Sequence, residues 1–116
     1  MGSLKDFDGG ETQSGIGPLA SVLGYSDHAL MFQFLPISVT RTDVEATWLV
    51  AESAREGVDY ELERLVWLWD VTTQQDTKIT EDNQLGVSSH FYRPGPYTDG
   101  EPTTALFTDW YLRQIA

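Results

Sequence analysis

Few side chains in this sequence could hold a metal ion or act in nucleophilic catalysis. The chain has no cysteine and only two histidines, His28 and His90. Disulfides, thiolate zinc sites, cysteine-ligated iron–sulfur clusters and a catalytic thiol are therefore excluded, as is a histidine-rich metal site built from this chain alone. The acidic stretch 52–63 lacks the ligand spacing and central glycine of a calcium loop. The candidate that stands out is one carboxylate, that of Asp76.

Asp76 stands out because helical periodicity places it among apolar residues. In a helix over 59–83, with about 100° between successive residues, Asp76 lies in the same arc as Leu65 and Trp69. A carboxylate there is costly to bury unless a cation or several hydrogen bonds meet it. The pattern alone favours a capping box with Thr73, in which a new helix starts. A metal ligand and a solvated surface aspartate are the alternatives.

Two helices are predicted in the second half of the chain. The first follows Asp59 as N-cap and extends toward Gln84, either unbroken or interrupted near Thr72–Thr73, with Gly86 as its natural end. A loop follows, marked by the turn signals Arg93-Pro94-Gly95-Pro96 and Asp99-Gly100. Thr103 or Thr104 then caps a second amphipathic helix, which carries Leu106, Phe107, Trp110, Tyr111 and Ile115.

Two strands are predicted before the helices, at 28–39 and 44–53. The two-residue period puts one side-chain set of the second strand on a single face: Val44, Ala46, Trp48 and Val50. The short connection 40–43 predicts an antiparallel hairpin. Pro36 cannot donate to the ladder, so it marks an edge or a bulge in the first strand.

The order of elements predicts an α+β fold, with an antiparallel sheet packed against a long helix and a C-terminal helix. At 116 residues the chain is long enough for one domain. We expect a loop-rich segment over 1–28, with a short extended piece at 19–23, and the domain itself over 29–116. Trp48 and Trp69 are expected in the core. Trp67, about 200° around the helix from Trp69, is as well suited to an interface.

The charge of the chain argues against two classes of partner. Eighteen acidic residues against seven basic ones give a net charge of −11. Such a field repels phosphate backbones and anionic lipid, so nucleic acid and membrane surfaces are not expected partners. The N-terminal residues carry no signal-peptide pattern, and no apolar run approaches the length of a membrane span. A cytoplasmic location is the expectation.

Several motifs in combination resemble a known family. They are Leu68-Trp69-Asp70-Val71-Thr72-Thr73-Gln74-Gln75-Asp76, Glu81-Asp82-Asn83-Gln84-Leu85-Gly86-Val87-Ser88-Ser89, Tyr92-Arg93-Pro94-Gly95-Pro96-Tyr97, Glu101 and Trp110-Tyr111. Over roughly 29–116 the chain resembles the C-terminal part of the catalytic domain of Rieske non-haem iron oxygenases. The likeness is to the α subunit of aromatic-ring-hydroxylating dioxygenases, especially members that act on betaine, choline or carnitine. It implies part of a helix-grip fold, an antiparallel sheet curled around a long helical segment.

The resemblance gives Asp76 a role. The matching aspartate in the family is the carboxylate of a two-histidine, one-carboxylate Fe(II) site, whose three ligands leave positions open for oxygen and substrate. The histidine pair is expected upstream of residue 1. So is the Rieske domain, whose two cysteines and two histidines hold a [2Fe-2S] cluster. Neither His28 nor His90 matches the pair, and His90 is more typical of a loop or interface residue. No catalytic residue is assigned within the chain.

The resemblance implies O2-dependent hydroxylation or demethylation of an aromatic or quaternary-ammonium substrate by the intact protein, with the isolated chain inactive. The sheet face carrying Trp48 would form part of the pocket wall. Implied partners are the missing N-terminal part or a companion oxygenase chain, further copies in a trimer, and a reductase that supplies electrons. Two alternatives stay open: a stand-alone helix-grip module that binds a small ligand without metal, and a structural or assembly subunit whose own open sheet edge and apolar surface pair with another chain.

Overall fold

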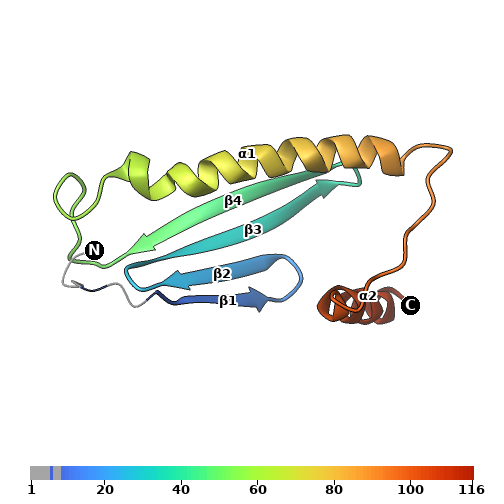
Figure 1. Cartoon of the computed structure of the whole chain (residues 1–116), viewed down its shortest axis with the longest axis horizontal. Coiled ribbons are helices and arrows are strands. Elements are labelled where there is room, and N and C mark those ends of the chain that lie inside the picture. The colour runs from blue at the N-terminus through green and yellow to red at the C-terminus, as the bar shows by residue number, and fades with distance from the viewer. Residues whose placement is uncertain (1–5, 7–8) are drawn as a thin grey trace. The chain divides into compact units, whose positions relative to one another are not determined.

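The computed structural model describes Asp6 and residues 9–116. Its elements, in chain order, are β1 (Glu11–Ile16), β2 (Ala20–Tyr25), β3 (His28–Ser38), β4 (Arg41–Val50), α1 (Leu62–Val87) and α2 (Pro102–Ile115) (Figure 1). The chain forms two compact units, Met1–Gln74 and Gln75–Ala116. The first holds the sheet and the beginning of α1, and the second holds the rest of α1 and α2. The predicted α+β class is confirmed.

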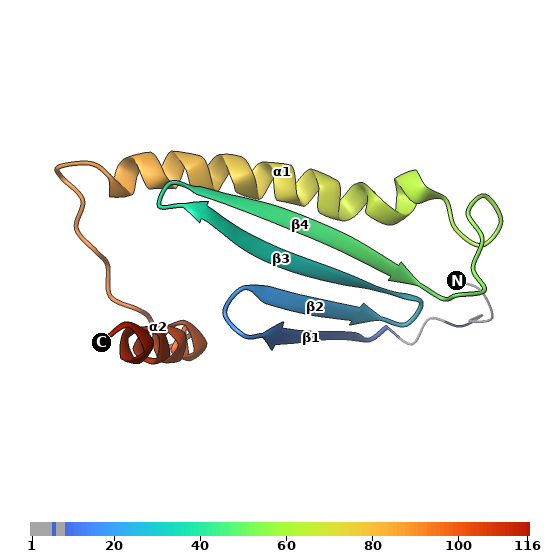
Figure 2. The same ribbon diagram turned by 180° about the vertical axis from the view of Figure 1, so that it is seen from behind.

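The four strands form one antiparallel sheet in the order β1-β2-β3-β4, each joined to the next by a hairpin (Figure 2). The predicted pairing of β3 with β4 is confirmed, from His28 opposite Val50 to Ser38 opposite Arg41. The turn between them is shorter than expected, because β4 begins at Arg41. The register shifts between Pro36 and Ser38, which confirms the predicted irregularity at this proline.

The expectation that 1–28 is mostly loop is wrong for the described residues of this segment. β1 and β2 lie there and pair over six positions, from Glu11 opposite Tyr25 to Ile16 opposite Ala20. Gly17 has a φ of 60° in the turn between them, a conformation that glycine adopts without steric cost. The segment has little strand preference of its own, and pairing with β3 overrides that preference. Residues 1–5 and 7–8 lie outside the described residues.

One face of the sheet carries the core. Among the described residues the buried apolar side chains are Leu23, Leu30 and Phe32. Leu30 lies between Leu23 and Trp48 in the strand register. Trp69 of α1 packs against this cluster. Its ring and that of Phe32 meet edge to face, with their centroids 5.5 Å apart. The predicted core positions of Trp48 and Trp69 are therefore confirmed.

The start of α1 differs from the sequence prediction. Asp59 is not the N-cap: its carboxylate accepts a hydrogen bond from the Arg55 N–H at 3.0 Å and closes a turn ahead of the helix. The first helical hydrogen bond runs from Leu65 N–H to the Glu61 carbonyl, also at 3.0 Å. Glu61 therefore occupies the N-cap position, and the helix begins at Leu62.

The predicted capping box at Thr73 and Asp76 is also wrong, because both residues lie inside a helix of 26 residues. The Thr72 hydroxyl donates to the Leu68 carbonyl at 2.9 Å. This bond satisfies a threonine within a helix without breaking it. The helix ends at Val87, one residue beyond the predicted Gly86.

The second predicted helix is confirmed as α2, but its cap is not a threonine. Pro102 stands at the first helical position, where its missing N–H costs nothing, and Glu101 occupies the N-cap position. The Glu101 carboxylate instead accepts the N–H and the hydroxyl of Thr98, both at 2.9 Å. These two hydrogen bonds close the predicted turn at Asp99-Gly100, directly before α2 begins.

Candidate functional site

Asp76 lies inside α1, in the unit Gln75–Ala116, and its side chain is exposed. Within Asp6 and 9–116, nothing forms a hydrogen bond or an ion pair with its carboxylate. Lys78, two residues further on, pairs with Asp82 instead, at 2.6 Å. In this chain Asp76 is thus a solvated aspartate whose oxygens are free to accept an external partner.

The two histidines do not join Asp76. His28 begins β3, and its Nδ1 lies 2.7 Å from the Asp27 carboxylate. His90 lies in the turn after α1. Its ring and that of Phe91 meet edge to face, with their centroids 5.3 Å apart. In the described part of the chain, no three His, Cys, Asp or Glu side chains gather where they could hold a metal ion. One carboxylate does not fit an iron ion, so these residues alone do not make the expected site.

The motif residues that carried the resemblance fall on three successive elements. The stretch Leu68 to Asp76 and most of the stretch 81–89 lie on α1. The stretch 92–97 lies in the following loop, and Trp110-Tyr111 lies on α2. Two aromatic rings of α2, those of Phe107 and Trp110, are 5.8 Å apart between centroids.

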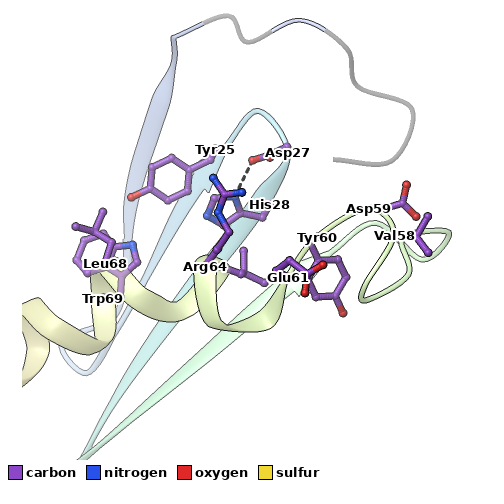
Figure 3. A pocket seen from close by; sticks show the side chains of 11 residues that line it. Tyr25, Asp27, His28, Val58, Asp59, Tyr60, Glu61, Arg64, Leu68 and Trp69 are labelled. Atoms are coloured by element: carbon purple, nitrogen blue, oxygen red, sulfur yellow. Dashed lines mark hydrogen bonds and ion pairs between the residues drawn. The ribbon is translucent and has the colours of Figure 1, made fainter.

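A pocket that the sequence analysis did not predict lies between the β2–β3 connection and the start of α1 (Figure 3). Its volume is about 570 Å³, which is in the range of small-ligand sites. It is lined by Tyr25, Asp27, His28, Val58, Asp59, Tyr60, Glu61, Arg64, Leu65, Leu68 and Trp69. These residues come from two separate stretches of the chain, 25–28 and 58–69, and nothing in the sequence marks the two stretches as neighbours. Trp48 packs against the core, and its place in the substrate-pocket wall of the intact protein stays a prediction.

Much of the polar chemistry of this pocket is already used within the fold. The hydrogen bond from His28 lowers the pKa of Asp27, and this pair fixes the β2–β3 connection. Tyr25 stacks on His28 at 4.7 Å between ring centroids, and burial raises the pKa of its hydroxyl, with the nearby Glu11 adding to the shift. Arg64 extends from α1 across the pocket (Figure 3). Asp27, His28 and Tyr25 therefore contact one another and stabilise the fold, and the Arg64 side chain lies beside them (Figure 3).

Comparison with known proteins identifies the family. The family model described as "Ring hydroxylating alpha subunit (catalytic domain)" matches residues 6–116. The chain belongs to this family. The resemblance stated from the motifs is therefore confirmed, and the match also takes in the two strands that the sequence analysis missed.

Two curated relatives are both named glycine betaine monooxygenase oxygenase subunit. The relative from Pseudomonas aeruginosa (strain UCBPP-PA14) is 39% identical over 116 residues, which are 99% of this chain and 27% of the relative. The relative from Chromohalobacter salexigens is 44% identical over 86 residues, which are 73% of this chain and 19% of the relative. This chain therefore spans about a quarter of the length of the first relative (27%).

Neither α1 nor α2, the helices of the described residues, has both the length and the apolar character needed to cross a membrane.

Proposed function

We propose that the chain is the C-terminal part of the catalytic domain of a Rieske-type non-haem iron oxygenase, and that Asp76 supplies the carboxylate of its iron site. The observation that carries the proposal is the family match over residues 6–116, and Asp76 lies in the stretch whose resemblance to the family implies an iron carboxylate. The match to 27% of the P. aeruginosa relative supports a catalytic domain that extends beyond these residues.

The surroundings of Asp76 support a role as a metal ligand. The continuous helix α1 fixes its backbone, and no described residue occupies its carboxylate. Carboxylate oxygen, together with imidazole nitrogen, makes the facial donor set that Fe(II) oxygenases use. The proposal takes the two imidazoles from outside the 116 residues, because neither His28 nor His90 matches the family's histidine pair and, in the described part of the chain, no three His, Cys, Asp or Glu side chains gather. The isolated chain is therefore inactive in this proposal.

The substrate class we favour is a quaternary ammonium compound, acted on by O2-dependent demethylation or hydroxylation. The support is that both relatives are named for glycine betaine. Their description as oxygenase subunits supports a separate reductase as electron donor, with a [2Fe-2S] cluster in a Rieske domain outside these residues. Assembly into a homo-oligomer is part of the same proposal.

The test is iron analysis of a chimera. The chimera is the P. aeruginosa relative with its matching segment replaced by these 116 residues. The chimera is loaded with Fe(II) under anaerobic conditions, its total iron is measured, and the iron of the [2Fe-2S] cluster is subtracted. We expect about one mononuclear iron per chain to remain. Asp76→Asn should remove that iron. Asp70→Asn is the matched control, because it neutralises another exposed aspartate of α1 and should leave the iron in place.

Two results would contradict the assignment of Asp76. One is a folded Asp76→Asn chimera that keeps its mononuclear iron. The other is an isolated 116-residue chain that binds iron stoichiometrically and keeps it after this substitution, since the ligands would then lie elsewhere in the chain.

A further inference from the structure

The pocket beside the β2–β3 connection lies wholly within the unit Met1–Gln74. Its lining comes from residues 25–28 and 58–69. The volume of about 570 Å³ is sufficient for a small molecule. Ligand binding here does not depend on the role of Asp76, which does not line the pocket.

Several polar side chains of the pocket already have partners. The Asp27 carboxylate is bonded to His28 at 2.7 Å. The Asp59 carboxylate accepts the Arg55 N–H at 3.0 Å. Asp27, His28 and Asp59 are therefore satisfied within the fold and do not call for a ligand.

Two charged side chains of the pocket have no such partner. Within Asp6 and 9–116, neither the Arg64 guanidinium nor the Glu61 carboxylate forms a hydrogen bond or an ion pair. Side chains three residues apart at a helix start are close enough to pair. These two point to different parts of the pocket instead: Arg64 extends toward the β2–β3 connection, and Glu61 lies beside Tyr60 (Figure 3). The pocket thus offers one cation and one anion to an external partner.

Apolar surface accompanies the two charges. Leu65, Leu68 and Trp69 line the same pocket, and Leu65 and Trp69 are partly buried. Such surface favours a ligand that has a hydrocarbon part, because burial of that part removes apolar area from water.

The charges decide which class of ligand the pocket favours. The chain carries a net charge of −11, so a free anion meets a repulsive field as it approaches. An organic cation is repelled by Arg64 within the pocket. A molecule with both a carboxylate and an ammonium group has no net charge, and it can pair with Arg64 and Glu61 at once.

We propose that this pocket binds a small zwitterion, with its carboxylate on Arg64, its ammonium group on Glu61 and its hydrocarbon part against Leu65 and Leu68. Arginine suits the carboxylate because its planar guanidinium can donate two parallel hydrogen bonds. Both charged side chains are exposed, so the binding is weak, with an expected Kd of roughly 1 mM.

The test is a titration of the isotope-labelled chain with γ-aminobutyrate, followed by amide NMR. We expect saturable shifts at the amides of 25–28 and 58–69, and none in α2. Butyrate lacks the ammonium group and butylamine lacks the carboxylate. Each of these two probes should therefore bind at least about tenfold more weakly.

Two substitutions with matched controls locate the ligand. Arg64→Gln and Glu61→Gln should each weaken the binding of γ-aminobutyrate about tenfold. Arg55→Gln and Glu63→Gln remove the same charges from exposed side chains that do not line the pocket. These controls should leave the affinity within about twofold, because exposed charges at a distance are screened.

The chimera defined above gives the same readout if the isolated chain folds poorly. Its hydrogen exchange is measured by mass spectrometry with and without γ-aminobutyrate, at about ten times the expected Kd. Exchange of the amides of 58–69 should slow, and exchange of the amides of 102–115 should not change.

Three outcomes would overturn the proposal. The first is butyrate or butylamine binding as tightly as γ-aminobutyrate, which would mean that one of the two charges takes no part. The second is an affinity that Arg64→Gln leaves unchanged. The third is unchanged exchange at 58–69 in a folded chimera, which would mean that the rest of the polypeptide closes the pocket. The iron analysis of the chimera tests the proposed function separately.

Discussion

The side chain of His28 is of a type that could bind a metal, and in this structure it stabilises the connection between β2 and β3. Asp27 and His28 are adjacent in the sequence and are bonded at 2.7 Å, and Tyr25 stacks on the histidine ring. The pair joins β2 to β3 beside the start of α1. His28 therefore has a role in the fold, and it does not match the histidine pair that the family resemblance implies.

This pair predicts a dependence of stability on acid. The pKa of Asp27 is lowered from 3.8 by its hydrogen bond with His28. A lowered pKa contributes stability that is fully present above the unfolded value and is lost as the pH falls through the folded value. We therefore expect the free energy of unfolding to drop below about pH 4, with Asp27→Asn reducing that drop.

Urea unfolding followed by tryptophan fluorescence between pH 5 and pH 2.5 measures the effect, which should be below about 1 kcal/mol because the carboxylate is partly exposed. The control is Asp82→Asn in the second unit, which should leave the acid response of the sheet unchanged. An identical acid response in Asp27→Asn and the unmodified chain would contradict the prediction.

At the scale of elements, the continuity of α1 decides how Asp76 is presented. A helix of 26 residues keeps Thr73 and Asp76 in its interior. A helix restarted at Thr73 would instead use Asp76 to close its own N-terminus, and the carboxylate would be occupied. The unbroken helix therefore leaves the Asp76 side chain available.

Proline at residue 74 distinguishes the two arrangements. In the interior of a continuous helix, Gln74→Pro should cost about 3 kcal/mol and lower the helical circular dichroism, because it removes a hydrogen bond and clashes with the preceding turn. In a helix restarted after Thr73, residue 74 would be the first helical position, where proline is favoured. Gln74→Ala is the control and should be neutral or slightly stabilising. A Gln74→Pro chain as helical and stable as the control would mean that α1 is broken.

At the scale of the whole molecule, the small core limits what the isolated chain can do. Leu23, Leu30 and Phe32 are the buried apolar residues of the described part, whereas large side chains such as Trp67 (63% exposed) and Phe91 (86% exposed) face solvent. Burial of apolar area is the main favourable term in folding. The chain therefore carries more large apolar side chains than its small core buries.

This imbalance predicts marginal stability for the isolated chain. Its thermal unfolding should be broad and it should bind a hydrophobic dye such as ANS, both signs of loose packing. The chimera should unfold cooperatively, and its dye binding per chain should be much weaker. Differential scanning calorimetry and dye fluorescence on the two proteins make the comparison. A sharp calorimetric transition and negligible dye binding in the isolated chain would show that the 116 residues suffice as a domain.

The sequence by itself determined the features that depend on local pattern. The β3–β4 hairpin, the irregularity at Pro36, both helices and the core role of Trp69 follow from periodicity and from the fixed geometry of proline. Family membership likewise follows from motifs carried by α1, the following loop and α2. The hairpin, the irregularity and the helices depend on residues close together in the chain, and the apolar face of the helix already marks Trp69 as a core position, although its partners such as Phe32 are distant.

Only the tertiary structure decided the features that depend on distant partners. β2 is a strand because it pairs with β3, and β1 is a strand because it pairs with β2, although their own residues suggest a loop. The pocket beside the β2–β3 connection joins residues 25–28 to residues 58–69, two stretches that lie far apart in the chain. Local preference is worth only tenths of a kcal/mol per residue, so hydrogen bonding and burial between distant segments override it.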